Sequence, residues 1–205
     1  MRLIQARGNS SAIVRLTLAA LVAAAIGGGC MPRPGWEQLI EGEIGLRHFA
    51  QRGGGKWLAK DDSITVGPDG HGPAFLIARQ HFHHFEVELD YWASDNAIGS
   101  LLLRCHDTLR LDAANCYEVP LTGKHAGAVT GIATADMHGS TGGRWNTIAV
   151  RMFDQRLVVV LNGQRVVDTH DAQLDSGYLA LRWERGAMRF KRLEFNRLFH
   201  GRPAH

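Results

Sequence analysis

Apolar and polar residues alternate along two segments of the chain with the period of a β-strand. In residues 84–92 acids separate the apolar positions Phe85, Val87, Leu89 and Tyr91. Residues 145–153 repeat the pattern, with apolar side chains at Ile148, Val150 and Met152. Successive side chains on a strand point to opposite faces, so each segment predicts a strand with one buried face.

Short apolar runs separated by turn residues predict further strands along the rest of the chain. They cover residues 57–58, 63–66, 74–78, 99–105, 116–119, 156–161, 164–169, 177–183 and 188–196. The clearest turn is Asn162–Gly163, because Asn-Gly between two β-branched runs favours a two-residue hairpin. No segment carries an apolar stripe at helical spacing. About ten short strands with glycine-rich turns predict one all-β domain over residues 31–205, a sandwich or jelly roll.

The first thirty residues have the pattern of an export signal. An apolar run of eleven residues, 16–26, follows the basic residues Arg2, Arg7 and Arg15. The run is shorter than the about 20 residues that a membrane-spanning helix needs. Three glycines and Cys30 follow, as in bacterial lipoproteins whose cysteine carries the lipid. The alternative is an ordinary signal peptide cut within residues 23–29. Either interpretation predicts a signal in residues 1–30 and a protein of the periplasm or cell envelope, with membrane contact only through a lipid on Cys30.

Two cysteines remain after Cys30, and both lie in a predicted strand–loop–strand segment. An even pair in an oxidising compartment favours a disulfide between Cys105 and Cys116. Two buried free thiols are the alternative.

Charge and motifs exclude several classes of function. The formal net charge is only +3, and basic and acidic residues are interleaved, so no nucleic-acid partner is expected. The sequence lacks a phosphate-binding Walker loop, a dinucleotide fingerprint, a paired-cysteine zinc site, HExxH and the G-x-S-x-G nucleophile motif.

Two clusters of polar residues lie on or just before the predicted strand 84–92. Glu86, Glu88 and Asp90 lie about 7 Å apart on the face opposite its apolar residues. They could bind a sugar or a cation, but a solvated strand face is the simpler explanation. The cluster His81, His83 and His84 suggests a metal site but has no acid or cysteine at a recognised spacing.

Glu118 is an acid within the short apolar strand 116–119, where acids are poor strand formers. A functional carboxylate in a pocket would explain it, and so would a structural ion pair with Arg104 across the hairpin. His125 follows on the next loop, where a histidine can serve as a general base or be an ordinary surface residue.

Short motifs follow one another in an order typical of a known family. The order comprises Trp36, Leu39-Ile40-Glu41-Gly42, Trp57, Ser63-Ile64, Phe85-Glu86-Val87-Glu88-Leu89, residues 96–99 with Arg104, Tyr117-Glu118-Val119, His125, Thr130-Gly131, Trp145-Asn146-Thr147 and Asn162-Gly163. Over about residues 36–196 the chain resembles the 3-keto-disaccharide hydrolase domain family. The resemblance implies a concanavalin A-like jelly-roll sandwich of two antiparallel sheets.

The resemblance also implies a reaction on glycosides already oxidised to a ketone at C3. The ketone acidifies the proton on C2, so a base can form an enolate, the C1 substituent leaves, and water adds. On this basis Glu118 is the expected base, His125 the acid for the leaving oxygen, and Arg104 the enolate stabiliser, which a divalent metal ion could replace.

We also expect substrate contacts at Glu88, Asp90, Asn96 and Trp145, with a carbohydrate or glycoside as partner. The chain also departs from the family pattern, because Pro120 stands where Gln is usual. A non-catalytic glycan-binding protein and a structural surface lipoprotein therefore stay open as alternatives.

Overall fold

The computed structural model describes residues 33–67, 71–136 and 139–200, which form one compact unit. The predicted signal segment and Cys30 lie outside these residues. Within the described residues no helix is long and apolar enough to span a membrane.

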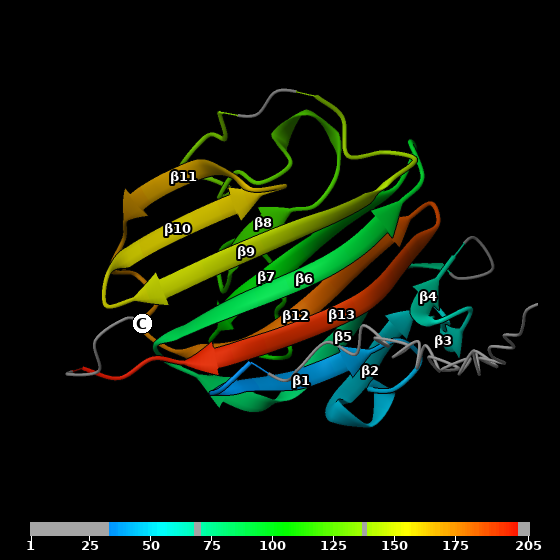
Figure 1. The fold of residues 1–205 in the computed structure, drawn as a ribbon, viewed down its shortest axis with the longest axis horizontal. Coiled ribbons are helices and arrows are strands. Elements are labelled where there is room, and N and C mark those ends of the chain that lie inside the picture. Colours follow the sequence, from blue (N-terminus) through cyan, green and yellow to red (C-terminus); the bar gives the residue numbers. More distant parts are fainter. Residues whose placement is uncertain (1–32, 68–70, 137–138, 201–205) are drawn as a thin grey trace, which may run out of the picture. The chain divides into compact units, whose positions relative to one another are not determined.

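The described residues fold into two antiparallel β-sheets (Figure 1). The first has eight strands, in the order β11-β10-β9-β6-β13-β4-β3, with β1 also paired to β13. The second has five, in the order β2-β5-β12-β7-β8. The strands are β1 Trp36–Glu41, β2 Phe49–Gly54, β3 Trp57–Lys60, β4 Ser63–Val66, β5 His71–Phe82, β6 Phe85–Ala93, β7 Ile98–Cys105, β8 Tyr117–Pro120, β9 Trp145–Phe153, β10 Arg156–Leu161, β11 Gln164–His170, β12 Gly177–Arg185 and β13 Met188–Arg197. Two 3-10 turns, Leu46–His48 and Gly123–His125, lie between them.

Alternation in the sequence predicts the two longest half-buried strands correctly. Along β6 every second side chain is buried, beginning with Phe85, and β9 buries Ile148, Val150 and Met152. The hairpin turn is also confirmed, since Asn162 and Gly163 join β10 to β11 with φ of 51° and 82°. The predicted all-β sandwich of two antiparallel sheets is therefore confirmed.

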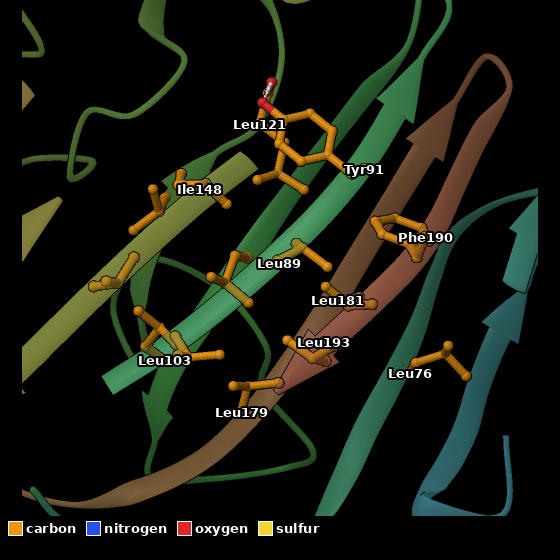
Figure 2. Packing of buried hydrophobic residues seen from close by; sticks show 14 of the residues in the cluster. Leu76, Leu89, Tyr91, Leu103, Leu121, Ile148, Leu179, Leu181, Phe190 and Leu193 are labelled. Carbon is orange, nitrogen blue, oxygen red and sulfur yellow. Dashed lines mark hydrogen bonds between the residues drawn. The ribbon is translucent and has the colours of Figure 1, made fainter. Parts of the chain in front are cut away.

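The main core lies between the inner faces of the two sheets (Figure 2). Leu89 of β6 and Leu193 of β13 face Leu103 of β7 and Leu181 of β12 across it. The one hydroxyl drawn in Figure 2 belongs to Tyr91 and donates a hydrogen bond of 2.7 Å to the carbonyl oxygen of Leu121. Because a buried hydroxyl without a partner is costly, this bond fixes the chain just after β8.

A second apolar cluster covers part of the outer face of the five-stranded sheet. Leu111 lies on the loop between β7 and β8 and packs with Leu102 and Ala180, which point away from the main core. Cys105 and Cys116 are joined by a disulfide at the base of this loop, with 4.2 Å between their Cα atoms. The predicted disulfide is thus present.

Candidate functional site

Glu118 projects from the outer face of the five-stranded sheet. Its neighbours Tyr117 and Val119 are buried in the core, so strand alternation turns the carboxylate outward. The adjacent strands supply its partners: Ser100 Oγ of β7 donates to Oε1 over 2.8 Å, and Arg182 of β12 donates to the same oxygen over 3.0 Å. Glu118 Oε2 accepts no hydrogen bond from any side chain or main-chain group in the described part of the chain. One carboxylate oxygen is therefore held and the other is available to a ligand.

The cation beside Glu118 is Arg182, which sequence reasoning missed. Its second terminal nitrogen donates to Glu184, and its buried Nε has no hydrogen-bond partner among the described residues. The signal in the sequence was a charged residue, Arg182, within the otherwise apolar run 177–183. It did not identify the partner, because β12 reaches β8 only through β7.

Glu118 and His125 line one cavity of about 460 Å³, at the end of the sandwich where β6 and β12 finish. Ser100 and Asn96 lie in its wall as well. A volume of this size is within the range of small-molecule sites. The structure therefore brings together three of the residues singled out in the sequence, namely Glu118, His125 and Asn96.

Main-chain hydrogen bonds fix the His125 loop against the strand that carries Glu118. The Gly127 N–H donates to the Pro120 carbonyl over 2.8 Å, and the Thr130 N–H donates to the Glu118 carbonyl over 2.9 Å. The loop position thus depends on the backbone rather than on the side chains that face the cavity.

Arg104 does not join this site, contrary to the convergence predicted from the sequence. It is 2% exposed, and its guanidinium donates to the carbonyl oxygens of His83, Asp154 and Leu174 at 2.8–3.1 Å. Burial lowers the pKa of this guanidinium. The physical reason for the displacement is its positive φ of 49°, which breaks the strand alternation at the end of β7. The alternative of an Arg104–Glu118 ion pair is wrong for the same reason, since Arg182 is the partner.

The predicted substrate contacts Glu88, Asp90 and Trp145 lie on the outer face of the other sheet. Arg192 of β13 donates to both Glu88 and Asp90, and these hydrogen bonds, above all the one to Asp90, raise its pKa. The ring of Trp145 lies 5.6 Å from the guanidinium carbon of Arg189. This acid row forms a surface ion-pair network, so the structure does not bring it to the Glu118 cavity.

The histidine cluster divides between two environments. His81 packs edge-on against Tyr178, with 5.3 Å between the ring centroids. His84 instead lies near Asp154 and His200, and their potential ligand atoms are all within 4.8 Å of one another. These three residues could hold a metal ion, and the acid and second histidine come from distant parts of the sequence.

A family profile described as the 3-keto-alpha-glucoside-1,2-lyase-like domain matches residues 35–196. No curated protein sequence matches the chain.

Among solved structures, a candidate glycosyl hydrolase from Parabacteroides distasonis aligns with a TM-score of 0.66 and 16% identity, over 80% of this chain and 99% of its own. The carbohydrate-binding module CBM66 from Bacillus subtilis aligns with a TM-score of 0.57 and 19% identity, over 79% and 95%. The exoplasmic domain of VIP36 with bound Ca²⁺ and Man2 aligns with a TM-score of 0.64 and 11% identity, over 83% and 92%. These likenesses confirm the lectin-like sandwich fold. The family match covers most of the chain and confirms the resemblance seen in the sequence. It indicates a glycoside hydrolase-like or carbohydrate-binding protein. The chain therefore belongs to the 3-keto-alpha-glucoside-1,2-lyase-like domain family.

Proposed function

We propose that the chain cleaves 3-keto-glycosides in the cavity between Glu118 and His125. The observation that supports this most is the state of the Glu118 carboxylate. Its Oε1 is fixed by Ser100 and Arg182, while Oε2 is left without a partner among the described residues. A positioned carboxylate with one available oxygen is suited to accept a proton from carbon.

In the proposed reaction Glu118 Oε2 takes the proton from C2 of the sugar. The electron pair of the broken C–H bond forms an enolate with the C3 ketone and then expels the oxygen substituent at C1. His125 gives a proton to that leaving oxygen. Water adds to C1 of the unsaturated product, and a proton returns to C2, so the net reaction is hydrolysis.

Arg182 takes the role that the sequence assigned to Arg104. Its guanidinium donates to Glu118 from the same outer face of the sheet, so its positive charge can stabilise the negative charge that develops on the ketone oxygen. This assignment requires no metal ion at the Glu118 cavity.

The test is turnover of 3-keto-glucosides in D₂O, followed by NMR of the released sugar. Elimination and hydration place deuterium on C2, whereas direct hydrolysis of the glycosidic bond leaves the original proton there. Glu118→Gln should lower turnover by about 100-fold or more, the usual scale for a lost general base. Glu86→Gln, the same change on the opposite sheet, is the matched control and should turn over as the wild type does. Retained turnover in Glu118→Gln would remove this residue from the mechanism.

Non-catalytic glycan binding is the second candidate, favoured by Pro120 in the family motif and by the carbohydrate-binding module and Man2-bound lectin among the fold relatives. It predicts that wild type and Glu118→Gln both bind glycans while neither releases product from any 3-keto-glucoside.

We also infer that the protein is exported and anchored through Cys30. The basic start, the apolar run 16–26 and the glycines before Cys30 support this. Mass spectrometry of the protein from its native cells should find a lipid-bearing Cys30 as the first residue. An intact Met1 terminus in the cytoplasmic fraction contradicts the inference.

A further inference from the structure

A second cavity, of about 720 Å³, lies at the opposite end of the sandwich from Glu118. Its wall is formed where β6 begins, where β9 turns into β10, and after β13, at the left of Figure 1. His84, Asp154 and His200 line it. We propose that these three residues bind a divalent transition metal ion such as Zn²⁺.

Two of the three distances between the side chains are close to the edges of a zinc coordination shell, and the third, between the two imidazoles, is within 4.8 Å. Asp154 Oδ1 lies 3.4 Å from His84 Nε2 and 3.1 Å from His200 Nε2. Ligands about 2.0–2.1 Å from a tetrahedral zinc ion are about 3.3–3.4 Å apart. An ion can therefore enter with only small movements of these side chains, and the open cavity leaves room for water as the fourth ligand.

The donor set selects the class of metal. Two imidazole nitrogens and one carboxylate suit Zn²⁺ and related transition metals, whereas Ca²⁺ requires a shell of oxygen ligands. The proposed ion therefore differs from the Ca²⁺ of the lectin relative.

Packing around the ligands holds them in place. The ring of Phe153 lies 4.9 Å from both imidazole rings, measured between centroids. The Leu198 N–H donates to the His84 carbonyl over 2.9 Å, which ties the end of β13 to the start of β6. Arg104 supports two of the ligand-bearing turns, since it donates to the carbonyls of His83 and Asp154. This gives the buried arginine a positioning role at this end of the sandwich.

Metal binding requires the loss of one hydrogen bond. The Asp154 N–H donates to His84 Nδ1 over 3.1 Å, which places the ring proton on Nε2. Coordination through Nε2 moves that proton to Nδ1, so the Asp154 amide must turn away. This amide lies in the short turn between β9 and β10, so the lost hydrogen bond is not one that pairs these two strands.

The test is calorimetric titration of the metal-free full chain, without a polyhistidine tag, with Zn²⁺ and separately with Ca²⁺. One Zn²⁺ per chain should bind with a dissociation constant of about 10 μM or less, and Ca²⁺ should not bind. Addition of Co²⁺ in place of Zn²⁺ should give the visible absorption of a four-coordinate ion.

Variants decide whether the named residues are the ligands. His200→Ala and Asp154→Asn should each weaken Zn²⁺ binding by about 100-fold or more. His106→Ala, which removes an exposed histidine of the disulfide loop, should leave it unchanged. Both ligand side chains are exposed, so the variants should match the wild type in metal-free thermal unfolding. Unchanged affinity in His200→Ala and Asp154→Asn, or no Zn²⁺ binding by the wild type, overturns the proposal. Neither result bears on the Glu118 cavity, because the two sites lie at opposite ends.

Discussion

Reduction of the Cys105–Cys116 disulfide is expected to lower the free energy of unfolding by about 2.8 kcal/mol. The two residues are 11 apart in sequence. In the loop-entropy relation, a closed loop of about 12 residues removes roughly 9.5 cal/mol/K from the unfolded chain, which gives this value at 25 °C.

The folded loop has other contacts that reduction leaves intact. Leu111 packs on the outer apolar cluster, and Asp112 Oδ1 accepts hydrogen bonds from the main-chain N–H groups of Ala114 and Asn115. The side-chain amide of Asn115 also donates to this oxygen and is the main cause of the lowered pKa of Asp112. Most of the effect of reduction should therefore fall on the unfolded state.

Urea unfolding followed by tryptophan fluorescence, with and without excess reductant, measures the effect. For an m-value of about 2 kcal/mol/M, the midpoint should fall by about 1.4 M urea in the reduced protein. The Cys105→Ala, Cys116→Ala double variant is the control and should show no dependence on reductant. A shift below about 0.3 M would refute the reasoning, because the cross-link would then constrain the unfolded chain far less than loop entropy requires.

Two further predictions concern buried polar groups. Arg104→Met should destabilise the protein by at least about 3 kcal/mol, because three main-chain carbonyls lose their donor. Turnover of 3-keto-glucosides per folded molecule should not change. Urea unfolding measures the stability, and a loss of turnover without a loss of stability would contradict a purely structural role for Arg104. Tyr91→Phe should lower the free energy of unfolding by about 1–2 kcal/mol, because the Leu121 carbonyl is left unsatisfied. An unchanged urea midpoint would show that water or another donor replaces the Tyr91 hydroxyl.

Most of the strands were predicted from the sequence, and the clearest signals came from strands whose two faces differ. β6 and β9 alternate cleanly because one face meets the core, and the Asn162–Gly163 turn carries its own conformational signature. The strands β1 and β2 were not predicted. β2 buries only Phe49 and ends in two glycines, so its pairing with β5 depends on contacts distant in sequence.

The candidate site was also predicted only in part. Glu118 stood out as an acid between buried neighbours, and His125 followed on the next loop. Arg104 was wrongly placed with them because the hairpin at Cys105 and Cys116 was expected to bring it beside Glu118, and its positive φ cannot be read from a sequence. Arg182 was missed because the order of strands in the sheet decides which cation faces Glu118.

The loop that follows β8 has a consequence for self-association. β8 is the edge strand of its sheet, and an edge with unpaired main-chain groups is a template for strand addition by another chain. Here the outward carbonyls of Glu118 and Pro120 are already occupied by the N–H groups of Thr130 and Gly127. Pro120 in addition has no N–H to offer. The same hydrogen bonds that shape the cavity thus protect this edge from intermolecular pairing. Because they involve only main-chain groups, substitutions of the side chains that line the cavity do not expose the sheet edge to aggregation.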